Sequence, residues 1–349
     1  MRVNSLVNRH SRLLAGGERL RQGGGSFQLA MMDKAMASPK TLNGKLVVLM
    51  GGSGFLGAQI AQALLYRGAR VRIAARRPDL AFGLRPLANL GQLQSVRCDA
   101  GNRAGIERAI QGADAVVNCV GSFSGNLMRL MGEAPGWMAE AAREAGAQAF
   151  VHVSAIVPEA HEGNRYAEAK RAGEERVRAA FPNATILRPS LLFGQGGGVT
   201  ELFAPLIARL PVLPVFGPQA KVQPAYVADV AEAAARAVCD PSKLGGKIFE
   251  LAGPEVLTML ELQQRIAAGQ RRKPILLPMP DGIAALFAAL PGTPMNADQW
   301  GLLKAGNVAS PSASGFKALG IDPKPLGLFL EDWMTPYRKN GRFAERLSY

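Results

Sequence analysis

The chain has 349 residues, of which 48% are hydrophobic and 19% charged, and its formal net charge is +14. This composition is that of a globular protein with one large or two ordinary domains, and it excludes a largely disordered chain. The basic excess fits an anionic cofactor, an anionic lipid or an acidic protein surface, with a solvated basic surface as the alternative. Aromatic residues make up only 6% and the arginines are scattered, which disfavours a nucleic-acid-binding protein.

Cysteine and histidine usage disfavours a disulfide framework and a metal enzyme. The three cysteines are far apart and form no CxxC pair, and the three histidines show no HExxH spacing (Cys98, Cys119, Cys239; His10, His152, His161). We therefore expect a reducing compartment and no metal. The nearest approach to a membrane span is the apolar stretch 283–290, which is shorter than the roughly 18 residues that a span needs. We expect a soluble or peripheral protein.

Residues 1–43 differ from the rest of the chain. The first 25 residues carry five arginines but only one acid, Glu18, and end in a run of three glycines. This composition is similar to an organellar transit peptide. We favour two alternatives: a disordered leader, or an upstream start codon with the true start at Met31, Met32 or Met36. This segment is left out of the fold argument.

A strand, a glycine turn and a helix follow one another at residues 46–65. Five apolar residues, Leu46–Met50, predict a strand buried on both faces. Glycines at 51, 54 and 57 follow in the spacing GxxGxxG, and the next eight residues have helical composition. Backbone N–H groups at such a helix start bind the pyrophosphate of a dinucleotide, and the glycines allow its close approach. The alternative is a plain turn in a chain with 40 glycines.

Strand and helix patterns then alternate up to about residue 195. Predicted strands cover 46–50, 70–75, 95–98, 113–119, 149–154 and 184–188, and predicted helices include 104–111, 135–145 and 166–180. This alternation predicts a parallel sheet with right-handed crossovers and helices on both faces. We therefore expect an α/β fold, a doubly wound Rossmann-type domain over residues 44–195.

Beyond residue 195 prolines and glycines interrupt the pattern. A helix over 226–238 and a strand over 249–251 are still predicted. The remaining sequence consists of short helices and proline-rich links. We expect residues 196–349 to supply the remaining core elements and a smaller, irregular C-terminal lobe for a substrate or a docking partner.

The end of the second predicted strand indicates which nicotinamide cofactor is bound. An acid there holds the ribose 2′-hydroxyl of NAD, whereas arginine binds the 2′-phosphate of NADP. This chain has Arg76 and Arg77, which favours NADP(H) over NAD(H), with two solvated surface arginines as the alternative. Asp99 is placed to accept a hydrogen bond from the adenine amino group. We assign the cofactor site to Gly51, Ser53, Gly54, Phe55, Leu56, Gly57, Arg76, Arg77, Asp99, Ala100, Val120, Gly121, Tyr166, Lys170 and Pro189.

The candidate catalytic residues are Ser154, Tyr166 and Lys170. Tyr166 and Lys170 are four residues apart and therefore share one helix face. We expect the lysine ammonium to lower the pKa of the phenol, making Tyr166 a usable proton donor or acceptor, and to hold the nicotinamide ribose. Ser154 closes the fifth strand, where its hydroxyl can bond a substrate carbonyl. The alternative is a pair of solvated helix residues. For His152 and His161 we favour a satisfied strand histidine and a loop histidine.

These motifs resemble the short-chain dehydrogenase/reductase superfamily, in its extended or atypical branch. The segments 187–194 (LRPSLLFG) and 224–231 (PAYVADVA) look like further blocks of that branch. Four other segments are similar to the dehydrogenase-like accessory subunits of respiratory complex I: 84–93 (LRPLANLGQL), 165–174 (RYAEAKRAGE), 222–224 (VQP) and 319–321 (LGI). The resemblance runs from about Lys45 to about Arg342. The alanine-, glycine- and arginine-rich composition looks bacterial.

The resemblance implies an NADP(H)-bound accessory or assembly subunit of NADH:ubiquinone oxidoreductase, in the cytoplasm and peripheral on the inner face of the inner membrane. The nucleotide would be structural, with the glycine turn on the pyrophosphate, Arg76 on the 2′-phosphate, and Tyr166 and Lys170 on the nicotinamide ribose. Basic residues near the end (Arg338, Lys339, Arg342, Arg346) would meet acidic protein or anionic lipid. Because all three catalytic positions are filled, the alternative is a free-standing NAD(P)-dependent oxidoreductase or epimerase acting on a small carbonyl, sugar-nucleotide or lipid-like substrate.

Overall fold

The computed structural model describes residues 41–157, 163–290, 295–339 and 341. The leader expected over residues 1–43 lies outside these ranges, apart from its last three residues. His161, Arg342 and Arg346 also lie outside them. The chain from Thr41 onward forms one compact unit.

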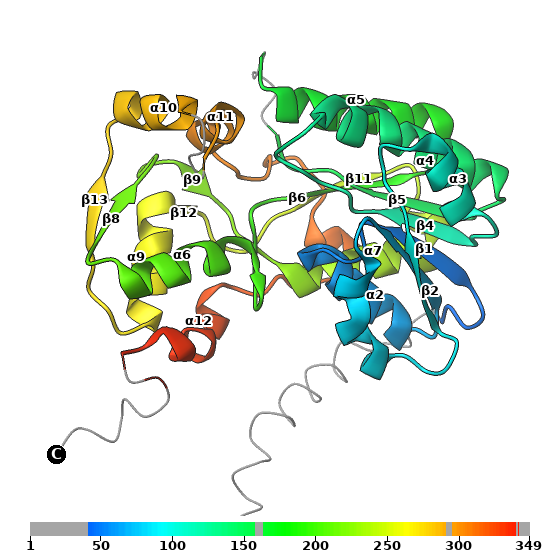
Figure 1. Cartoon of the computed structure of the whole chain (residues 1–349), viewed down its shortest axis with the longest axis horizontal. Helices are drawn as coiled ribbons and strands as arrows, with labels where there is room; N and C mark the ends of the chain where they lie inside the picture. Colours follow the sequence, from blue (N-terminus) through cyan, green and yellow to red (C-terminus); the bar gives the residue numbers. More distant parts are fainter. Residues whose placement is uncertain (1–40, 158–162, 291–294, 340, 342–349) are drawn as a thin grey trace, which may run out of the picture. The chain divides into compact units, whose positions relative to one another are not determined.

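A seven-stranded parallel sheet forms the centre of this unit (Figure 1). Its strands are β1 (Leu46–Met50), β2 (Arg70–Ala75), β3 (Leu93–Arg97), β4 (Ala115–Asn118), β5 (Ala149–Val153), β6 (Thr185–Pro189) and β11 (Ile248–Leu251). They lie in the order β11-β6-β5-β4-β1-β2-β3, and every neighbouring pair is parallel. Each of the strands predicted for this sheet is present, with ends displaced by at most two residues.

Two layers of helices cover this sheet. One layer contains α2 (Phe55–Tyr66), α7 (Val227–Cys239) and the 3₁₀ segment η1 (Pro78–Leu87); the other contains α3 (Arg103–Ile110), α4 (Ala134–Glu144) and α5 (Arg165–Ala180). Val47 and Leu49 of β1 lie in the core cluster under the first layer. Val48 and Met50 lie in the cluster under the second. Side chains of successive strand residues point to opposite faces, so an all-apolar strand is buried by both layers. The predicted Rossmann-type fold is confirmed.

The strand order places a topological switch point between β1 and β4. The chain moves outward from β1 through β2 to β3, and then returns to β4 on the other side of β1. Connections leaving the carboxyl ends of β1 and β4 therefore diverge, and the crevice between them is where ligands bind in folds of this kind. The predicted glycine turn follows β1 directly.

Elements after β6 return to the sheet and also build a second core. The elements are β7 (Leu192–Gly194), α6 (Gly198–Arg209), β8 (Val212–Val215), β9 (Lys221–Val222), β10 (Ala225–Tyr226), α8 (Pro241–Leu244), β12 (Leu257–Thr258), α9 (Met259–Gly269), β13 (Ile275–Pro278), α10 (Asp281–Ala289), α11 (Ala297–Ala305), η3 (Phe316–Leu319), α12 (Gly327–Trp333) and η4 (Thr335–Tyr337). The second core joins α6, α9 and α12 around β8. Two elements beyond residue 195, α7 and β11, pack with the main sheet. The domain boundary at residue 195 stays a prediction.

Membrane-spanning helices are absent from the described ranges, since none of their helices combines the length and the apolar character that a crossing requires.

Candidate functional site

The turn between β1 and α2 contains three glycines of the predicted motif. The fold requires glycine at Gly51 and Gly57 and leaves free space beside Gly54. A Cβ on Gly57 would lie 2.6 Å from the carbonyl oxygen of Gly51, which the packing does not allow. Gly51 has a φ of 83°, a region that favours glycine. Gly54 differs, because a Cβ there would meet only that same oxygen, at the ordinary distance of 3.5 Å. The space beside Gly54 is therefore open.

Gly54 is also the N-cap of α2, and no side chain caps the first turn of this helix. The first N–H groups of a helix have no partner within the helix, and the positive end of its dipole attracts anions. An exposed glycine with uncapped N–H groups beside it provides a cradle for a phosphate. A side chain at residue 54 would occupy this open space.

The residues predicted to bind the adenosine half lie at the carboxyl ends of β2 and β3. Arg76 and Arg77 follow β2 and are exposed. One carboxylate oxygen of Asp99, just beyond β3, accepts a hydrogen bond from the N–H of Gly101 at 2.9 Å. This bond fixes the loop and leaves the other oxygen for a ligand. Ala100 is buried beside it.

Asn118, at the end of β4, is a residue that the sequence argument did not single out. Its side-chain oxygen accepts a hydrogen bond from the N–H of Val120 at 3.0 Å, and its amide nitrogen lies 3.0 Å from Nδ1 of His152. Asn118 thereby fixes the loop that carries Val120 and Gly121. A Cβ on Gly121 would meet no atom within 4 Å, so this part of the crevice is open. A strand-terminal asparagine is the only signal that the sequence offers for this role.

Lys170 is the link between the helix α5 and the strand β5. Its Nζ donates a hydrogen bond to the carbonyl oxygen of Val153 at 3.2 Å and lies 5.9 Å from the centroid of the Tyr166 ring. Val153 precedes Ser154, so Lys170 brings the predicted catalytic residues to one end of β5. Asn164 caps α5 by accepting a hydrogen bond from the N–H of Ala167, which sets where the helix begins.

Burial shifts the pKa values of both Tyr166 and Lys170. It raises the pKa of Tyr166 to about 12 and lowers the pKa of Lys170 to about 8. We expected the lysine to lower the pKa of the tyrosine, and that expectation is wrong for the nucleotide-free protein. The phenolate loses more by leaving water than it gains from an ammonium that is itself desolvated.

His152 was predicted to be a satisfied strand histidine, and this is half right. It lies on β5 and is buried, and its Nδ1 accepts a hydrogen bond from the amide of Asn118. Within the described residues, however, neither its Nε2 nor the buried Oγ of Ser154 has a hydrogen-bond partner. Burial, together with the charge of Lys170, lowers the pKa of His152 to about 3, so the ring is neutral. Two buried polar atoms near the carboxyl end of β5 are thus left for a ligand to satisfy.

The open cradle at Gly54 follows β1, and these two unpartnered atoms lie near the carboxyl end of β5; β4 lies between the two strands in the sheet. A phosphate fits the cradle, and the hydroxyl and amide groups of a ribosyl nicotinamide fit the unpartnered atoms. The residues present therefore fit a nicotinamide dinucleotide. Pro189, also assigned to this site, is buried at the end of β6.

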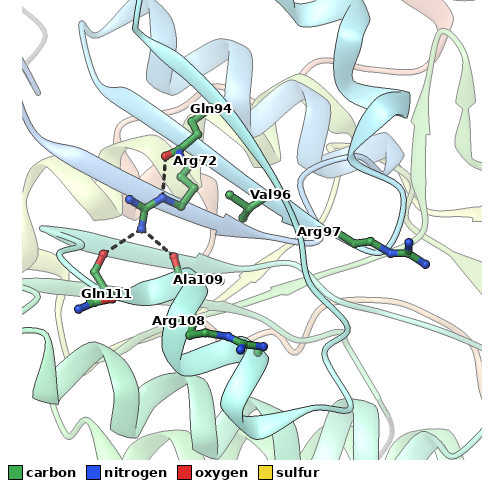
Figure 2. A pocket seen from close by; sticks show the side chains of 8 residues that line it. Arg72, Gln94, Val96, Arg97, Arg108, Ala109 and Gln111 are labelled. Carbon is green, nitrogen blue, oxygen red and sulfur yellow. Dashed lines mark hydrogen bonds between the residues drawn. The ribbon is translucent and has the colours of Figure 1, made fainter.

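A separate cavity of about 440 Å³ lies between β2, β3 and α3 (Figure 2). Arg72 fills one side of it, donating hydrogen bonds to the carbonyl oxygens of Ala109 and Gln111 at 2.9 and 2.8 Å. A third bond, at 2.9 Å, reaches the side chain of Gln94. Arg72 thus satisfies the carboxyl end of α3. None of the predicted site residues lines this cavity.

Comparison with known proteins identifies the family. The model of the NAD dependent epimerase/dehydratase family matches residues 47–252, and the chain belongs to this family. The family binds nicotinamide dinucleotides, and the predicted superfamily is confirmed.

Two curated relatives carry different descriptions. The chain is 30% identical over 311 residues to NADH dehydrogenase (ubiquinone) 1 alpha subcomplex subunit 9 of Mus musculus mitochondria, covering 86% of this chain and 82% of the relative. It is 32% identical over 240 residues to the ceramide reductase of Caulobacter vibrioides, covering 68% and 74%. Among solved structures, the NADPH-dependent quinone oxidoreductase of Escherichia coli, complexed with NADPH, has a TM-score of 0.65 at 20% identity, covering 81% of this chain and 98% of that one. This last likeness concerns the fold.

Proposed function

We propose that this protein holds NADP(H) as an accessory or assembly subunit of NADH:ubiquinone oxidoreductase. The observation that carries this proposal is the length of the similarity to the mouse subunit. That similarity extends over 311 residues, whereas the family model covers only residues 47–252. The shared sequence therefore includes much of the C-terminal region, which the common nucleotide fold does not require and which a docking partner would contact.

In this proposal the chain binds the dinucleotide along the crevice. The N–H groups beside Gly54 hold the pyrophosphate, and Arg76 with Arg77 holds the 2′-phosphate, which gives NADP(H) its preference over NAD(H). Exposure of both arginines directly after β2 supports this assignment. Asp99 bonds the adenine, and Tyr166 with Lys170 bonds the nicotinamide ribose.

A holding role agrees with the protonation of the site. The bound cofactor supplies a hydride when a substrate is present, and a proton donor must then act beside it. The pKa of Tyr166 is raised to about 12, so its hydroxyl is protonated at neutral pH and can donate a hydrogen bond to the ribose. Lys170 is engaged by the Val153 carbonyl and anchors the ribose side of the crevice. Binding rather than steady turnover is the role that these features support.

We further propose a peripheral location on the inner face of the inner membrane, where subunits and anionic lipid are at hand. One residue assigned to this contact has another use. Arg338 donates hydrogen bonds to the carbonyl oxygens of Gly269 and Glu331 at 3.2 and 2.9 Å, and its side chain is only 9% exposed. Lys339 is exposed and remains available.

The test is gentle purification from membranes, with mass spectrometry of both the bound nucleotide and the copurifying proteins. NADP(H) together with subunits of NADH:ubiquinone oxidoreductase is the expected result. A protein that carries the nucleotide but purifies alone contradicts the subunit proposal. A protein without any nucleotide contradicts the cofactor site.

The second candidate is a free-standing NAD(P)-dependent oxidoreductase or epimerase. It is favoured by the complete set of Ser154, Tyr166 and Lys170, and by the buried Ser154 hydroxyl, which has no hydrogen-bond partner among the residues that the structure describes. A monodisperse protein that oxidises NADPH with a carbonyl compound, and loses this activity in the variant Tyr166→Phe, would support this function over the first.

A further inference from the structure

The loop between β4 and the π-helical segment η2 (Met128–Glu133) places an aromatic ring on Tyr166. The ring of Phe123 lies flat against the ring of Tyr166, with centroids 4.6 Å apart and planes inclined by 14°. The outer side of Phe123 faces solvent, and the residue is 46% exposed. A large apolar ring that is half in water gains little from burial, so its position calls for another explanation.

A residue from the C-terminal region of the sequence binds the backbone of Phe123. The carbonyl oxygen of Phe123 accepts a hydrogen bond from the side chain of Asn296 at 3.2 Å. Asn296 is the N-cap of α11 and forms a capping box with Gln299. The same helix start is fixed to α5, because Asp298 accepts hydrogen bonds from the backbone and guanidinium of Arg165. Phe123 therefore sits on a support that also fixes the helix carrying Tyr166.

The other surroundings of Tyr166 are packed. Leu127, Met131 and Ala169 form a buried cluster, and Tyr166 and Leu130 pack against it. These side chains come from η2 and α5 and cannot move without disturbing both helices. Phe123 is different, because it belongs to a loop, is half-exposed and is held through its carbonyl oxygen by the side chain of Asn296. It is the part of the enclosure that can open.

We propose that Phe123 is the specificity-determining residue of the Tyr166 site: its ring excludes carbonyl compounds from the phenol, so that the nucleotide is held without turnover. This inference rests on the proposed function and explains why a complete set of Ser154, Tyr166 and Lys170 accompanies a holding role. The ring of Phe123 stacks on Tyr166, and burial raises the pKa of that phenol to about 12.

The reaction that Phe123 blocks is the reduction of a carbonyl to an alcohol. The carbonyl carbon would gain the hydride of the bound NADPH, and the carbonyl oxygen would gain the proton of the Tyr166 hydroxyl. The cofactor would leave as NADP⁺, and the tyrosine would regain its proton from water. The proton transfer needs the carbonyl oxygen within hydrogen-bonding distance of the phenol.

The test compares Phe123→Ala and Phe123→Leu with the wild-type full chain. The leucine variant keeps apolar bulk but lacks the stacked ring. Phe82→Ala is the matched control, because Phe82 is 50% exposed and stacks on Arg85 in η1, away from the site. Thermal unfolding and NADPH fluorescence establish that each variant folds and binds nucleotide.

Two measurements then decide. The first is the ultraviolet titration of the tyrosines, with Tyr166→Phe subtracted; we expect the phenol of residue 166 to titrate about one pH unit lower in Phe123→Ala. The second is single-turnover oxidation of bound NADPH by diacetyl, which we expect to be at least about tenfold faster in Phe123→Ala than in the wild type, with Phe123→Leu in between. Either an unchanged titration or an unchanged rate of oxidation in Phe123→Ala would overturn the inference.

The outcomes separate this inference from the proposed function. Failure of the wild-type protein to bind NADPH contradicts the holding role, whereas the titration needs no cofactor and still tests Phe123. Wild-type oxidation by diacetyl as fast as that of Phe123→Ala contradicts the inference alone.

Discussion

Replacing Lys170 with methionine should make the nucleotide-free protein more stable while removing its ability to hold nucleotide. Lys170 is 3% exposed, and burial lowers its pKa from the ordinary 10.5 to about 8. The folded state therefore carries a desolvated ammonium at neutral pH. Methionine has a similar length, is apolar and adapts to irregular cores.

The magnitude follows from the pKa shift. A difference of about 2.5 units corresponds to about 3 kcal/mol of destabilisation by the charged lysine. Loss of the hydrogen bond to the Val153 carbonyl costs about 1 kcal/mol, leaving a net gain of about 2 kcal/mol at pH 7. Because the folded pKa lies below the unfolded one, the unfolded chain binds more protons between pH 8 and 10.5. The wild type thus regains stability over this window, and the advantage of the variant disappears above it.

Urea unfolding at pH 7 and again above pH 10.5 measures this effect in the wild type and in Lys170→Met. Lys243→Met, which replaces an exposed lysine on α8, is the control and should change little at either pH. NADPH affinity, followed by fluorescence, should fall by at least about tenfold in Lys170→Met alone. A variant that is less stable than the wild type at pH 7, or whose gain persists above pH 10.5, would refute the account of Lys170 as a buried charge.

Three other substitutions separate folding from binding. Gly54→Val should leave thermal stability nearly unchanged and abolish NADPH binding. Gly57→Ala should destabilise the fold by about 1–3 kcal/mol, because its Cβ meets a carbonyl oxygen at 2.6 Å. Equal loss of stability in both variants would contradict the geometry of the turn. Arg76→Ala should weaken NADP(H) far more than NAD(H) in calorimetric titration, and equal weakening would remove its assignment to the 2′-phosphate. Arg271→Gly should stabilise the protein by about 0.5–1 kcal/mol in urea unfolding, because Arg271, two residues beyond the end of α9, has a φ of 55°, which glycine adopts without strain. A loss of stability would show that the arginine side chain contributes more than its backbone strain costs.

The main sheet could be predicted because its signals are local. β1 is a short apolar run, β5 is apolar except for His152, and both are fully buried and followed by a change of pattern within a few residues. The glycine turn could be predicted equally well, because a tight turn between a strand and a helix leaves no space for larger side chains at such positions. Tyr166 and Lys170 were found in the same way, from a four-residue spacing that places both on one helix face.

Features made by distant parts of the chain could not be predicted. Phe123 contacts Tyr166 across 43 residues, and Asn296 holds Phe123 across 173. The pKa of Tyr166 was predicted in the wrong direction because the sequence shows a neighbouring lysine but not the burial that opposes it. In the C-terminal region, β8 pairs with β13 some 60 residues later, so neither strand has a partner that local pattern could indicate.

The helix α5 was predicted from its local pattern, but its position depends on contacts with distant parts of the chain. At its start, Arg165 is bound by Asp298 of α11; further along, the buried carboxylate of Glu174 pairs with Arg188 of β6 at 2.7 Å. Arg188 also approaches Glu250 of β11, at 3.6 Å. The helix that carries Tyr166 and Lys170 is therefore positioned by segments that come after it in the sequence.

A complete catalytic set in one helix and one strand does not by itself establish turnover. In the proposed function the same lysine and tyrosine bind the nicotinamide ribose, so a holding role would also require them. Access to the phenol is decided elsewhere, by the loop at Phe123 and the helix start at Asn296. If turnover is suppressed in this chain, the cause lies in these later contacts, and restoring it requires opening the loop and not repairing the set.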